Sequence, residues 1–305
     1  MNCQLKMNEK YKIELLNHSQ AEDFKNMTYG RYKPFIAWMD NILGRLFPVG
    51  LYYEGRPAGL LLALHLSADT KADILSIFIE KEFRGRKLAV KMIACLEDKC
   101  REAGIKTVSS FYFDNRPFTA IINNLFDRCG FAPAEPEVFF CKCDKNFANM
   151  PLIEYTNLPA GFETFKWNDL NPALKEKLRL EWQNKDWFDE RLSPFSGEET
   201  MVARTSLGLR RKDEIVGWTI CNYYDQDTIA YTSIFIMPEF QGATLGIALQ
   251  MISIRAHLLT DLAQKYPFGL FHVRYDNPAR LKVVKKKFAK YSIEQYDQVI
   301  RKKNL

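Results

Sequence analysis

The sequence predicts a mixed α/β protein built from two tandem copies of one unit, each a mostly antiparallel mixed sheet flanked by helices. Three observations support this prediction. With 305 residues, the chain is about twice as long as an ordinary domain of ~150 residues. The ten residues that begin at Ser76 recur from Ser233 with seven identities, 157 positions further on. Apolar runs typical of strands alternate with segments of helical periodicity in both halves of the chain.

The first copy divides into strand-like runs and helical segments. The expected strands are residues 11–15, 49–53, 58–64, 74–79 and 108–113. A helical region that extends to Met39 follows the first strand, and Glu54-Gly55-Arg56-Pro57 is typical of a hairpin turn between the second and third. Leu88 and three later apolar residues share one face at i, i+4, i+7 and i+8 spacing, which predicts a helix there. Residues 120–127 form the last expected helix of this copy.

The second copy repeats this order. Its expected strands are residues 207–210, 215–222, 229–236 and 268–275, and its long helix runs from Leu245 to Leu259. The stretch 146–158 between the copies carries Asn and Pro with little helical periodicity, as a connection does. We therefore expect an N-terminal domain at residues 1–148 and a C-terminal domain at residues 149–305.

Composition and charge narrow the classes of function. A net charge of +6 permits an anionic ligand, but no stripe of interleaved aromatic and basic residues favours nucleic acid as a partner. No apolar run approaches the ~18 residues of a membrane span, and the N-terminus has no apolar stretch of secretory type. The seven cysteines show no Cys-x-x-Cys spacing and the four histidines are far apart in sequence. We expect reduced thiols, no metal and a cytoplasmic location.

A short turn between a strand and a helix occurs in each copy and suits an anion. Its residues are Arg84-Gly85-Arg86-Lys87-Leu88-Ala89 in the first copy and Gln241-Gly242-Ala243-Thr244-Leu245-Gly246 in the second. A helix N-terminus leaves backbone N–H groups unpaired, and its dipole favours negative charge. The second turn supplies small residues that let an anion approach the amides, and the first supplies cationic side chains. The alternative is that both glycines only make tight turns.

The strand and turn resemble the acyl-CoA-binding motif of the GNAT N-acetyltransferase superfamily, (Gln or Arg)-x-x-Gly-x-(Gly or Ala). The ends of this motif match in both copies, whereas Lys87 and Thr244 replace its central glycine. The tandem arrangement is similar to that of mycothiol synthase-like enzymes. The resemblance implies acetyl-CoA or another acyl-CoA as the donor, held by the strand end, the turn and an Asn near a later helix. The residues expected to bind it are Phe235, Ile236, Met237, Gln241, Gly242, Ala243, Thr244, Leu245, Gly246 and Asn277 in the second copy, and Phe78, Ile79, Glu80, Arg84, Gly85, Arg86, Lys87, Leu88 and Ala89 in the first.

Acyl transfer to an amine needs a group that removes a proton and can use one that returns a proton to the leaving thiolate. The resemblance implies a Tyr for the second task, but Phe126 and Val283 stand at its positions. The expected catalytic residues are Glu239, Asp227 and Tyr231, which lie around the donor strand of the second copy; the alternative for each is a solvated strand end. The smaller turn residues favour the second copy as the active unit, with the first degenerate or limited to donor binding.

These patterns predict an acyl-CoA-dependent N-acyltransferase that moves an acetyl or longer acyl group to a primary amine of a small molecule or a peptide. The alternative is a catalytically silent tandem protein that binds acyl-CoA, or a protein or peptide partner, as a sensor or scaffold. We expect an amine acceptor as partner, neither nucleic acid nor membrane, and a monomer or homodimer. The sequence leaves the acceptor and the acyl chain length open.

Overall fold

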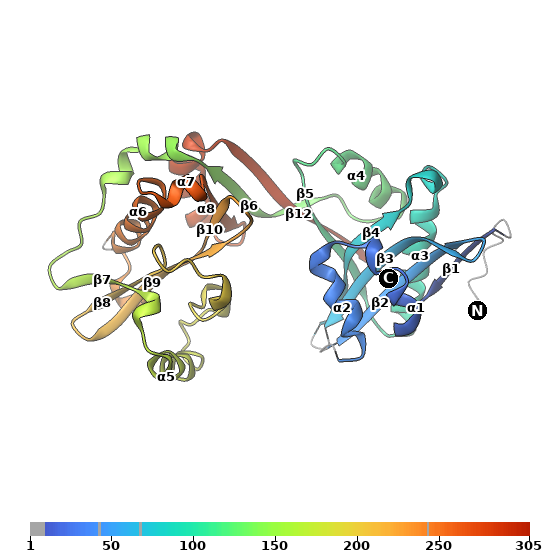
Figure 1. Ribbon diagram of the computed structural model, residues 1–305, viewed down its shortest axis with the longest axis horizontal. Coiled ribbons are helices and arrows are strands. Elements are labelled where there is room, and N and C mark those ends of the chain that lie inside the picture. The colour runs from blue at the N-terminus through green and yellow to red at the C-terminus, as the bar shows by residue number, and fades with distance from the viewer. Residues whose placement is uncertain (1–9, 42–43, 67–68, 243) are drawn as a thin grey trace. The chain divides into compact units, whose positions relative to one another are not determined.

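A computed structural model describes residues 10–41, 44–66, 69–242 and 244–305 (Figure 1). The chain forms two compact units, each of mixed α/β type. The first unit consists of the chain up to Glu137 together with Asp297–Leu305, and the second unit consists of Val138–Tyr296. This division differs from the boundary expected after residue 148, because the last strand of each repeat pairs within the other unit.

The sheet of the first unit has the strand order β1-β2-β3-β4-β5-β12. Its strands are β1 (Tyr11–Leu15), β2 (Gly44–Tyr53), β3 (Arg56–Leu66), β4 (Lys71–Ile79), β5 (Thr107–Phe113) and β12 (Glu294–Asn304). Only β4 and β5 are parallel neighbours. Its helices are α1 (His18–Glu22), α2 (Lys33–Ala37), α3 (Leu88–Glu102) and α4 (Thr119–Arg128). The expected strands and later helices are confirmed, and Glu54 and Gly55, both with positive φ, make the predicted hairpin turn.

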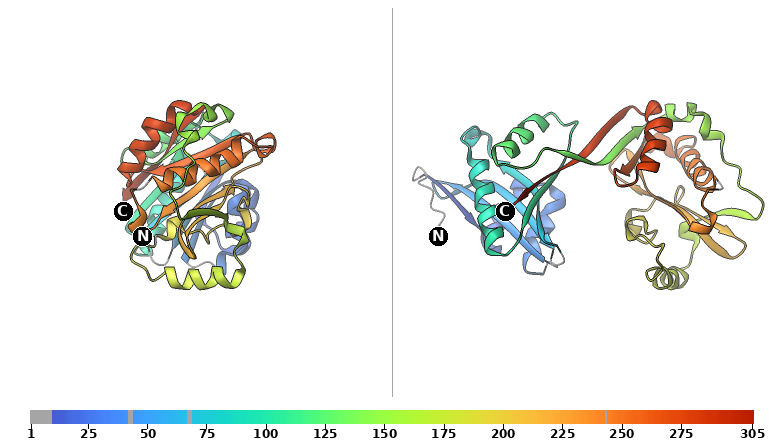
Figure 2. Two further views of the ribbon diagram at one scale, coloured as in Figure 1. Left: turned by 90° about the vertical axis from the view of Figure 1, so that its left-hand side faces the viewer. Right: turned by 180° about the vertical axis from the view of Figure 1, so that it is seen from behind.

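Helices cover both faces of this sheet. Along β3, Ala58, Leu61 and Ala63 belong to a core that includes the apolar face of α3, whereas Leu60 and Leu62 pack in a second core with α1 and α2. Successive side chains of a strand point to opposite faces, so both sets are buried and β3 has a continuous apolar sequence. The view from behind in Figure 2 shows α3 lying across the sheet of this unit.

The second unit repeats the plan with the strand order β6-β11-β10-β9-β8-β7. Its strands are β6 (Glu135–Cys143), β7 (Phe162–Lys166), β8 (Leu207–Arg211), β9 (Glu214–Tyr223), β10 (Thr228–Ile236) and β11 (Phe268–Arg274). Its helices are α5 (Pro172–Trp182), α6 (Leu245–Leu258), α7 (Leu262–Lys265) and α8 (Pro278–Val283). Here β10 and β11 are the parallel pair. The four expected strands and the long helix are confirmed, while β7 and α5 were not anticipated.

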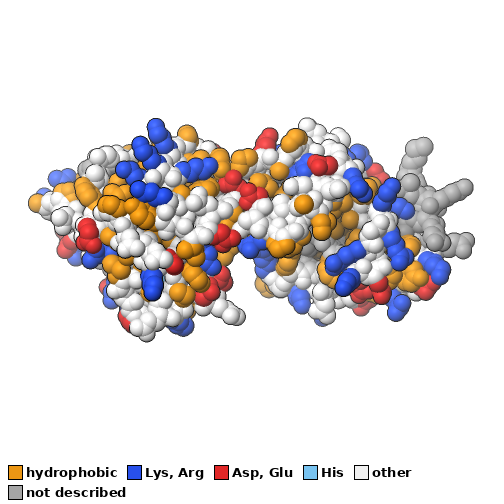
Figure 3. All heavy atoms as spheres, turned by 90° about the horizontal axis from the view of Figure 1, so that it is seen from above, with side chains coloured by type: hydrophobic (Ala, Val, Ile, Leu, Met, Phe, Trp, Pro, Cys, Tyr) orange, Lys and Arg blue, Asp and Glu red, His pale blue; other side chains and the backbone are white. Residues whose placement is uncertain are grey.

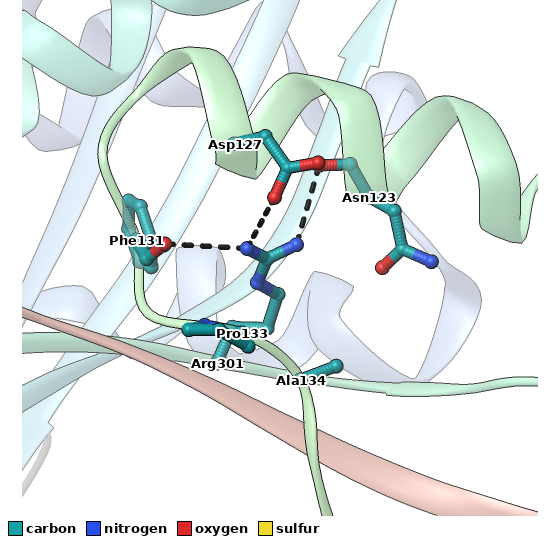
Figure 4. Close-up of a pocket in the computed structure, with 6 residues that line it drawn as sticks. All are labelled: Asn123, Asp127, Phe131, Pro133, Ala134 and Arg301. Atoms are coloured by element: carbon teal, nitrogen blue, oxygen red, sulfur yellow. Dashed lines mark hydrogen bonds and ion pairs between the residues drawn. The ribbon is translucent and has the colours of Figure 1, made fainter.

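The C-terminal strand fastens the helices of the first unit. β12 pairs with β5 from Gln298 opposite Phe113 to Asn304 opposite Thr107. Arg301, only 3% exposed, donates from Nε to the Ala132 carbonyl at 2.7 Å and from Nη1 to the Asn123 carbonyl at 3.3 Å. Figure 4 shows its guanidinium directed at the carboxylate of Asp127 on α4, beside a small pocket of about 370 Å³.

Lys303 makes a second attachment from the same strand. Its Nζ lies 2.7 and 2.8 Å from the two carboxylate oxygens of Glu97 on α3 and donates to the Cys129 carbonyl at 2.7 Å. The Glu97 side chain is only 8% exposed. A buried carboxylate depends strongly on its cationic partner, because water is not there to replace it.

We therefore expect Lys303→Met to lower the free energy of unfolding by about 3 kcal/mol. The variant leaves the Glu97 carboxylate with Arg101, at 3.6 Å, as its cationic partner. Urea unfolding followed by circular dichroism measures the change. The matched control is Lys302→Met on the same strand, where the side chain is exposed and the expected change is within about 0.5 kcal/mol. Equal losses in the two variants would contradict this role of Lys303.

Candidate active site

β4 and β5 pair over part of their length and then diverge. Parallel pairing joins Lys71–Ile74 to Thr107–Ser110. Directly after it, Leu75 is an extra residue in β4, because β3 pairs with the residues on either side of it and skips it. Such a bulge bends a strand and increases its local twist. Over the described residues Leu75–Ile79, the edge of β4 toward β5 has no strand partner, so its backbone polar groups are available to a ligand.

A cavity of about 970 Å³ opens where the two strands diverge. Residues of β4, the start of α3, β5 and α4 line it, together with Tyr29, Arg31 and Gln298. Ligand pockets in proteins commonly measure about 300–1,000 Å³. The lining is mainly apolar along the two strands and α4, which suits a long, partly apolar ligand.

The turn from Arg84 to Leu88 lines this cavity. Gly85 and Lys87 adopt left-handed φ values of +77° and +59°, and α3 begins directly after them with no side-chain cap. The first backbone N–H groups of the helix are therefore left for a ligand. Arg84 donates from Nε to the Ile79 carbonyl at 2.8 Å, which attaches the turn to the end of β4.

The charged residues that line the cavity are all cationic. They are Arg31, Arg84, Lys87, Arg116 and Arg128, and no Asp, Glu or His occurs among the described residues that line it. On the face that Figure 3 shows, Lys and Arg side chains occur on both units. Cationic side chains beside a helix N-terminus favour phosphate groups, both by charge and by hydrogen bonding.

Tyr112 supplies a phenol to the cavity that the sequence patterns did not single out. It lies on β5, and its ring stacks on that of Phe126 on α4 with 6.1 Å between centroids. Its hydroxyl donates to Oδ1 of Asn123. Burial raises the pKa of Tyr112 above its usual 10, an effect that the guanidinium of Arg301 partly offsets. The phenol is therefore protonated at neutral pH and can act as a donor.

Comparisons with known proteins agree with this geometry. Residues 11–131 match the family model described as the acetyltransferase (GNAT) family. The whole fold is similar to a tandem GNAT protein from the clavulanic acid biosynthesis pathway, with a TM-score of 0.65 and 11% identity over 97% of this chain and 98% of that one. Residues 11–131 thus belong to the GNAT family, and the chain as a whole has the fold of a tandem GNAT protein. A GCN5-related N-acetyltransferase from Sphaerobacter thermophilus is also similar in fold, with a TM-score of 0.60 and 14% identity over 98% and 97% of the two chains.

No curated protein matches the sequence. At these identities the solved structures establish the fold alone, whereas the family match of the first GNAT unit supports acyl-CoA-dependent acyl transfer as the general chemistry of the chain.

The cavity between β4 and β5 is lined by most of the first-unit residues that we expected to bind the acyl-CoA donor. Those that line it are Ile79, Arg84, Gly85, Lys87, Leu88 and Ala89. Phe78, Glu80 and Arg86 do not line it. The Glu80 backbone N–H donates to the Ala58 carbonyl at 3.0 Å, and Arg86 donates from Nη2 to the Glu82 carbonyl at 3.1 Å. The side chain of Arg86 is therefore turned back toward the preceding residues of the turn.

The second GNAT unit repeats the backbone of the site. Its parallel pairing joins Thr228–Tyr231 to Phe268–Phe271, and the extra residue that follows is Thr232. Gln241 donates from Nε2 to the Ile236 carbonyl at 2.8 Å, the same attachment that Arg84 makes in the first unit. The residues of β4 and of the turn thus have counterparts 157 positions later that form the same bulge, the same parallel pairing and the same attachment of the turn.

Side chains in the second unit occupy the equivalent region differently. Phe235 stacks between Trp218 and Trp187, with ring centroids 4.5 and 5.3 Å away. The hydroxyl of Tyr155 donates to Oγ1 of Thr244 at 3.0 Å, which places a phenol over the second turn. The other second-unit residues expected to bind the donor have varied roles. Ile236, Met237 and Leu245 have buried side chains. Gly242 has a φ of +88°, Gly246 lies near Ile236, and Asn277 caps α8. Ala243 lies outside the described residues.

The three expected catalytic residues do not come together. Asp227 precedes β10 and Glu239 follows it, so the nine residues of the strand separate them by about 30 Å of extended chain. Tyr231 is 3% exposed and donates its hydroxyl to Nδ1 of His257 at 2.8 Å, while Nε2 of that ring donates to the Tyr266 carbonyl at 2.7 Å. Tyr231 and His257 thus form a satisfied polar pair inside the core.

The part of the chain that the structure describes shows neither a metal site nor a membrane-spanning helix. No group of three or more His, Cys, Asp or Glu residues there is arranged to hold a metal ion. None of the helices found there has both the length and the apolar character that crossing a membrane requires.

The two histidines of the second unit, the buried His257 and the half-buried His272, predict a pH-dependent stability. Burial lowers the pKa of His257, and burial together with the charge of Arg280 lowers the pKa of His272 to about 4. Histidines of the unfolded chain bind protons near pH 6.5. Unfolding therefore takes up protons between about pH 6.5 and pH 4, and the free energy of unfolding should fall as the pH is lowered through this window.

Urea unfolding at pH 7.5, 6.0 and 5.0 measures this dependence. Tryptophan fluorescence is a suitable signal because Trp167, Trp182, Trp187 and Trp218 all belong to the second unit. The double variant His257→Gln/His272→Gln should lose less stability than the wild type over the same pH range. An unchanged dependence in the double variant would show that other groups cause it.

Proposed function

We propose that this protein is an acyl-CoA-dependent N-acyltransferase with its donor site in the first unit. It moves an acetyl or longer acyl group to a primary amine of a small molecule or a peptide, in the cytoplasm. The observation that carries the proposal is the cavity between the diverging strands β4 and β5, which reaches the uncapped start of α3 and has only cations among its charged lining residues.

The donor would lie along β4 with its phosphates at the turn. Beyond Leu75, the free edge of β4 offers backbone N–H and C=O groups to the amides of a pantetheine arm. The start of α3, with Arg84 and Lys87 beside it, offers N–H groups and positive charge to a pyrophosphate. The apolar walls of the cavity match the thioester and acyl end of the donor.

The choice of the first unit reverses the preference drawn from the sequence. That preference rested on the small residues of the second turn. At that turn, however, the hydroxyl of Tyr155 donates to Oγ1 of Thr244. The first turn has Arg84 and Lys87 at the positions of uncharged residues in the second. We propose that the second unit has a structural role.

Acyl transfer exchanges the thioester bond of the donor for an amide bond. The amine nitrogen attacks the thioester carbonyl carbon, a C–N bond forms and the C–S bond breaks. One proton leaves the nitrogen, and the thiolate of CoA takes up one proton. A backbone N–H of β4 beyond the bulge would polarise the carbonyl, and Tyr112 would donate the proton to sulfur. Since no Asp, Glu or His is among the described residues that line the cavity, the amine enters as the free base or loses its proton to water.

The first test compares bulky substitutions at the two equivalent turns. Gly85 and Gly242 have similar positive φ values of +77° and +88°, and an added Cβ at either meets no atom within 4 Å. Gly85→Trp and Gly242→Trp should therefore cost similar folding energy. Calorimetric titration with acetyl-CoA should show binding abolished in Gly85→Trp and retained in Gly242→Trp.

A milder variant controls for damage to the turn. Arg84→Gln keeps a side chain that can donate to the Ile79 carbonyl, as Gln241 does for Ile236. It should fold normally and weaken acetyl-CoA binding several-fold through the lost charge. Binding lost only in Gly242→Trp would move the donor site to the second unit, and a wild type that binds no acyl-CoA would overturn the proposal.

The role of Tyr112 predicts a loss of turnover without a loss of donor affinity. Tyr112→Phe keeps the ring stacked on Phe126 but removes the proton donor, so kcat should fall about 10²-fold while the Kd for acetyl-CoA stays near its wild-type value. Release of free thiol measures the rate. The control is Tyr53→Phe, a partly buried tyrosine of the same unit that packs on Phe83 and does not line the cavity. Equal rates in wild type and Tyr112→Phe would remove Tyr112 from the mechanism.

The catalytically silent alternative gives a different result in the same assays. A sensor or scaffold would bind acyl-CoA in the calorimeter but release no thiol with any amine. Thiol release that depends on an added amine, with formation of the corresponding amide in mass spectrometry, separates the two readings.

A further inference from the structure

The segment before α2 approaches the bulge of β4 and contributes to the cavity. Oγ1 of Thr28 and Oγ of Ser76 are 2.6 Å apart, and Ser76 directly follows the bulged Leu75. Tyr29 and Arg31, the next residues of this segment to reach the cavity, therefore lie near the bulge. Under the proposed function this is the end of the cavity where the thioester and the amine meet.

Three of the five cations among the described residues that line the cavity lie at two separate places along β4, while Arg116 and Arg128 line it from the segments of β5 and α4. Arg84 and Lys87 come after the end of the strand, whereas Arg31 belongs to the segment attached near the bulge. Leu75 and Ile79 are four positions apart on an extended strand, a distance of about 13 Å. Phosphates bound at the start of α3 therefore leave Arg31 for a different negative charge.

Two aromatic rings lie within cation–π distance of Arg31, which is an exposed residue. Its guanidinium carbon lies 4.7 Å from the ring centroid of Tyr32 and 5.7 Å from that of Tyr29. A guanidinium that lies over aromatic rings still has its N–H edge for a planar anion, which it can bind in two hydrogen bonds. Within the described residues no carboxylate lies within ion-pair distance of Arg31, and none lines the cavity.

We infer that the acceptor amine carries a carboxylate and that Arg31 binds it. The inference rests on the proposed function and names the class of its second substrate: a small amino acid-like amine. A guanidinium and a carboxylate match in charge and in planar geometry. A polyamine, in contrast, would bring a second positive charge to a site whose described lining residues include several cations and no carboxylate.

The test uses matched amines that differ in one substituent. Tyrosine is compared with tyramine, and 4-aminobutyrate with butylamine and putrescine, by acetyl-CoA-dependent thiol release at equal concentrations of free base. We expect kcat/KM to be at least tenfold higher for the carboxylated member of the reacting series. Arg31→Gln should raise the KM for that acceptor about 10- to 100-fold and leave the KM for acetyl-CoA unchanged. Arg31→Lys should restore part of the affinity.

Lys33→Gln is the control, because Lys33 is a nearby cation that bonds to Asn26 and does not line the cavity. A preference for butylamine, tyramine or putrescine, or an unchanged acceptor KM in Arg31→Gln, would overturn the inference and leave the transferase proposal standing. Acyl-CoA binding without thiol release for any amine would overturn both.

Discussion

The extra residue Leu75 in β4 ends the parallel pairing with β5 after Ile74, and the space between the two strands exists for this reason. A strand that loses its neighbour within a sheet leaves backbone N–H and C=O groups that require other partners. Here the unpaired edge lies beside the start of α3, whose own first N–H groups are also free. The ligand-binding capacity of the unit thus comes first from its backbone, and side chains adjust which ligand fits.

The two copies show how much of the site the backbone alone can preserve. Both have the bulge, the diverging parallel strands and a left-handed residue before the long helix. Their side chains differ at equivalent positions 157 residues apart: Ile74 and Cys100 of the first core correspond to Tyr231 and His257 of the second. At these positions the second unit has a buried hydrogen-bonded pair where the first unit has apolar side chains. The fold is therefore the same in both units although the interactions in the core differ.

Each unit contains the last strand of the other repeat, so neither sheet is complete without residues from both repeats. The last strand of the second repeat completes the sheet of the first unit, and Arg301 on that strand bonds to α4 through Asn123 and Asp127. Asn123 in turn accepts the hydroxyl of Tyr112, a lining residue of the cavity. One buried guanidinium therefore holds the helix that forms a wall of the candidate active site.

The sequence by itself determined the elements whose signals are local: the apolar runs of β3 and β4, the periodicity of α3, the hairpin turn at Glu54, and the repeat that revealed two units. It also located the turn after Arg84, because a strand, a glycine and a helix follow one another there. Tertiary structure alone showed that residues 294–304 form a strand, β12, and that it pairs with β5, since pairing with a distant strand leaves no local sequence signal. It also brought Tyr112 against Phe126 and Arg31 to the cavity, because contacts between distant segments depend on how the faces of helices and sheets pack.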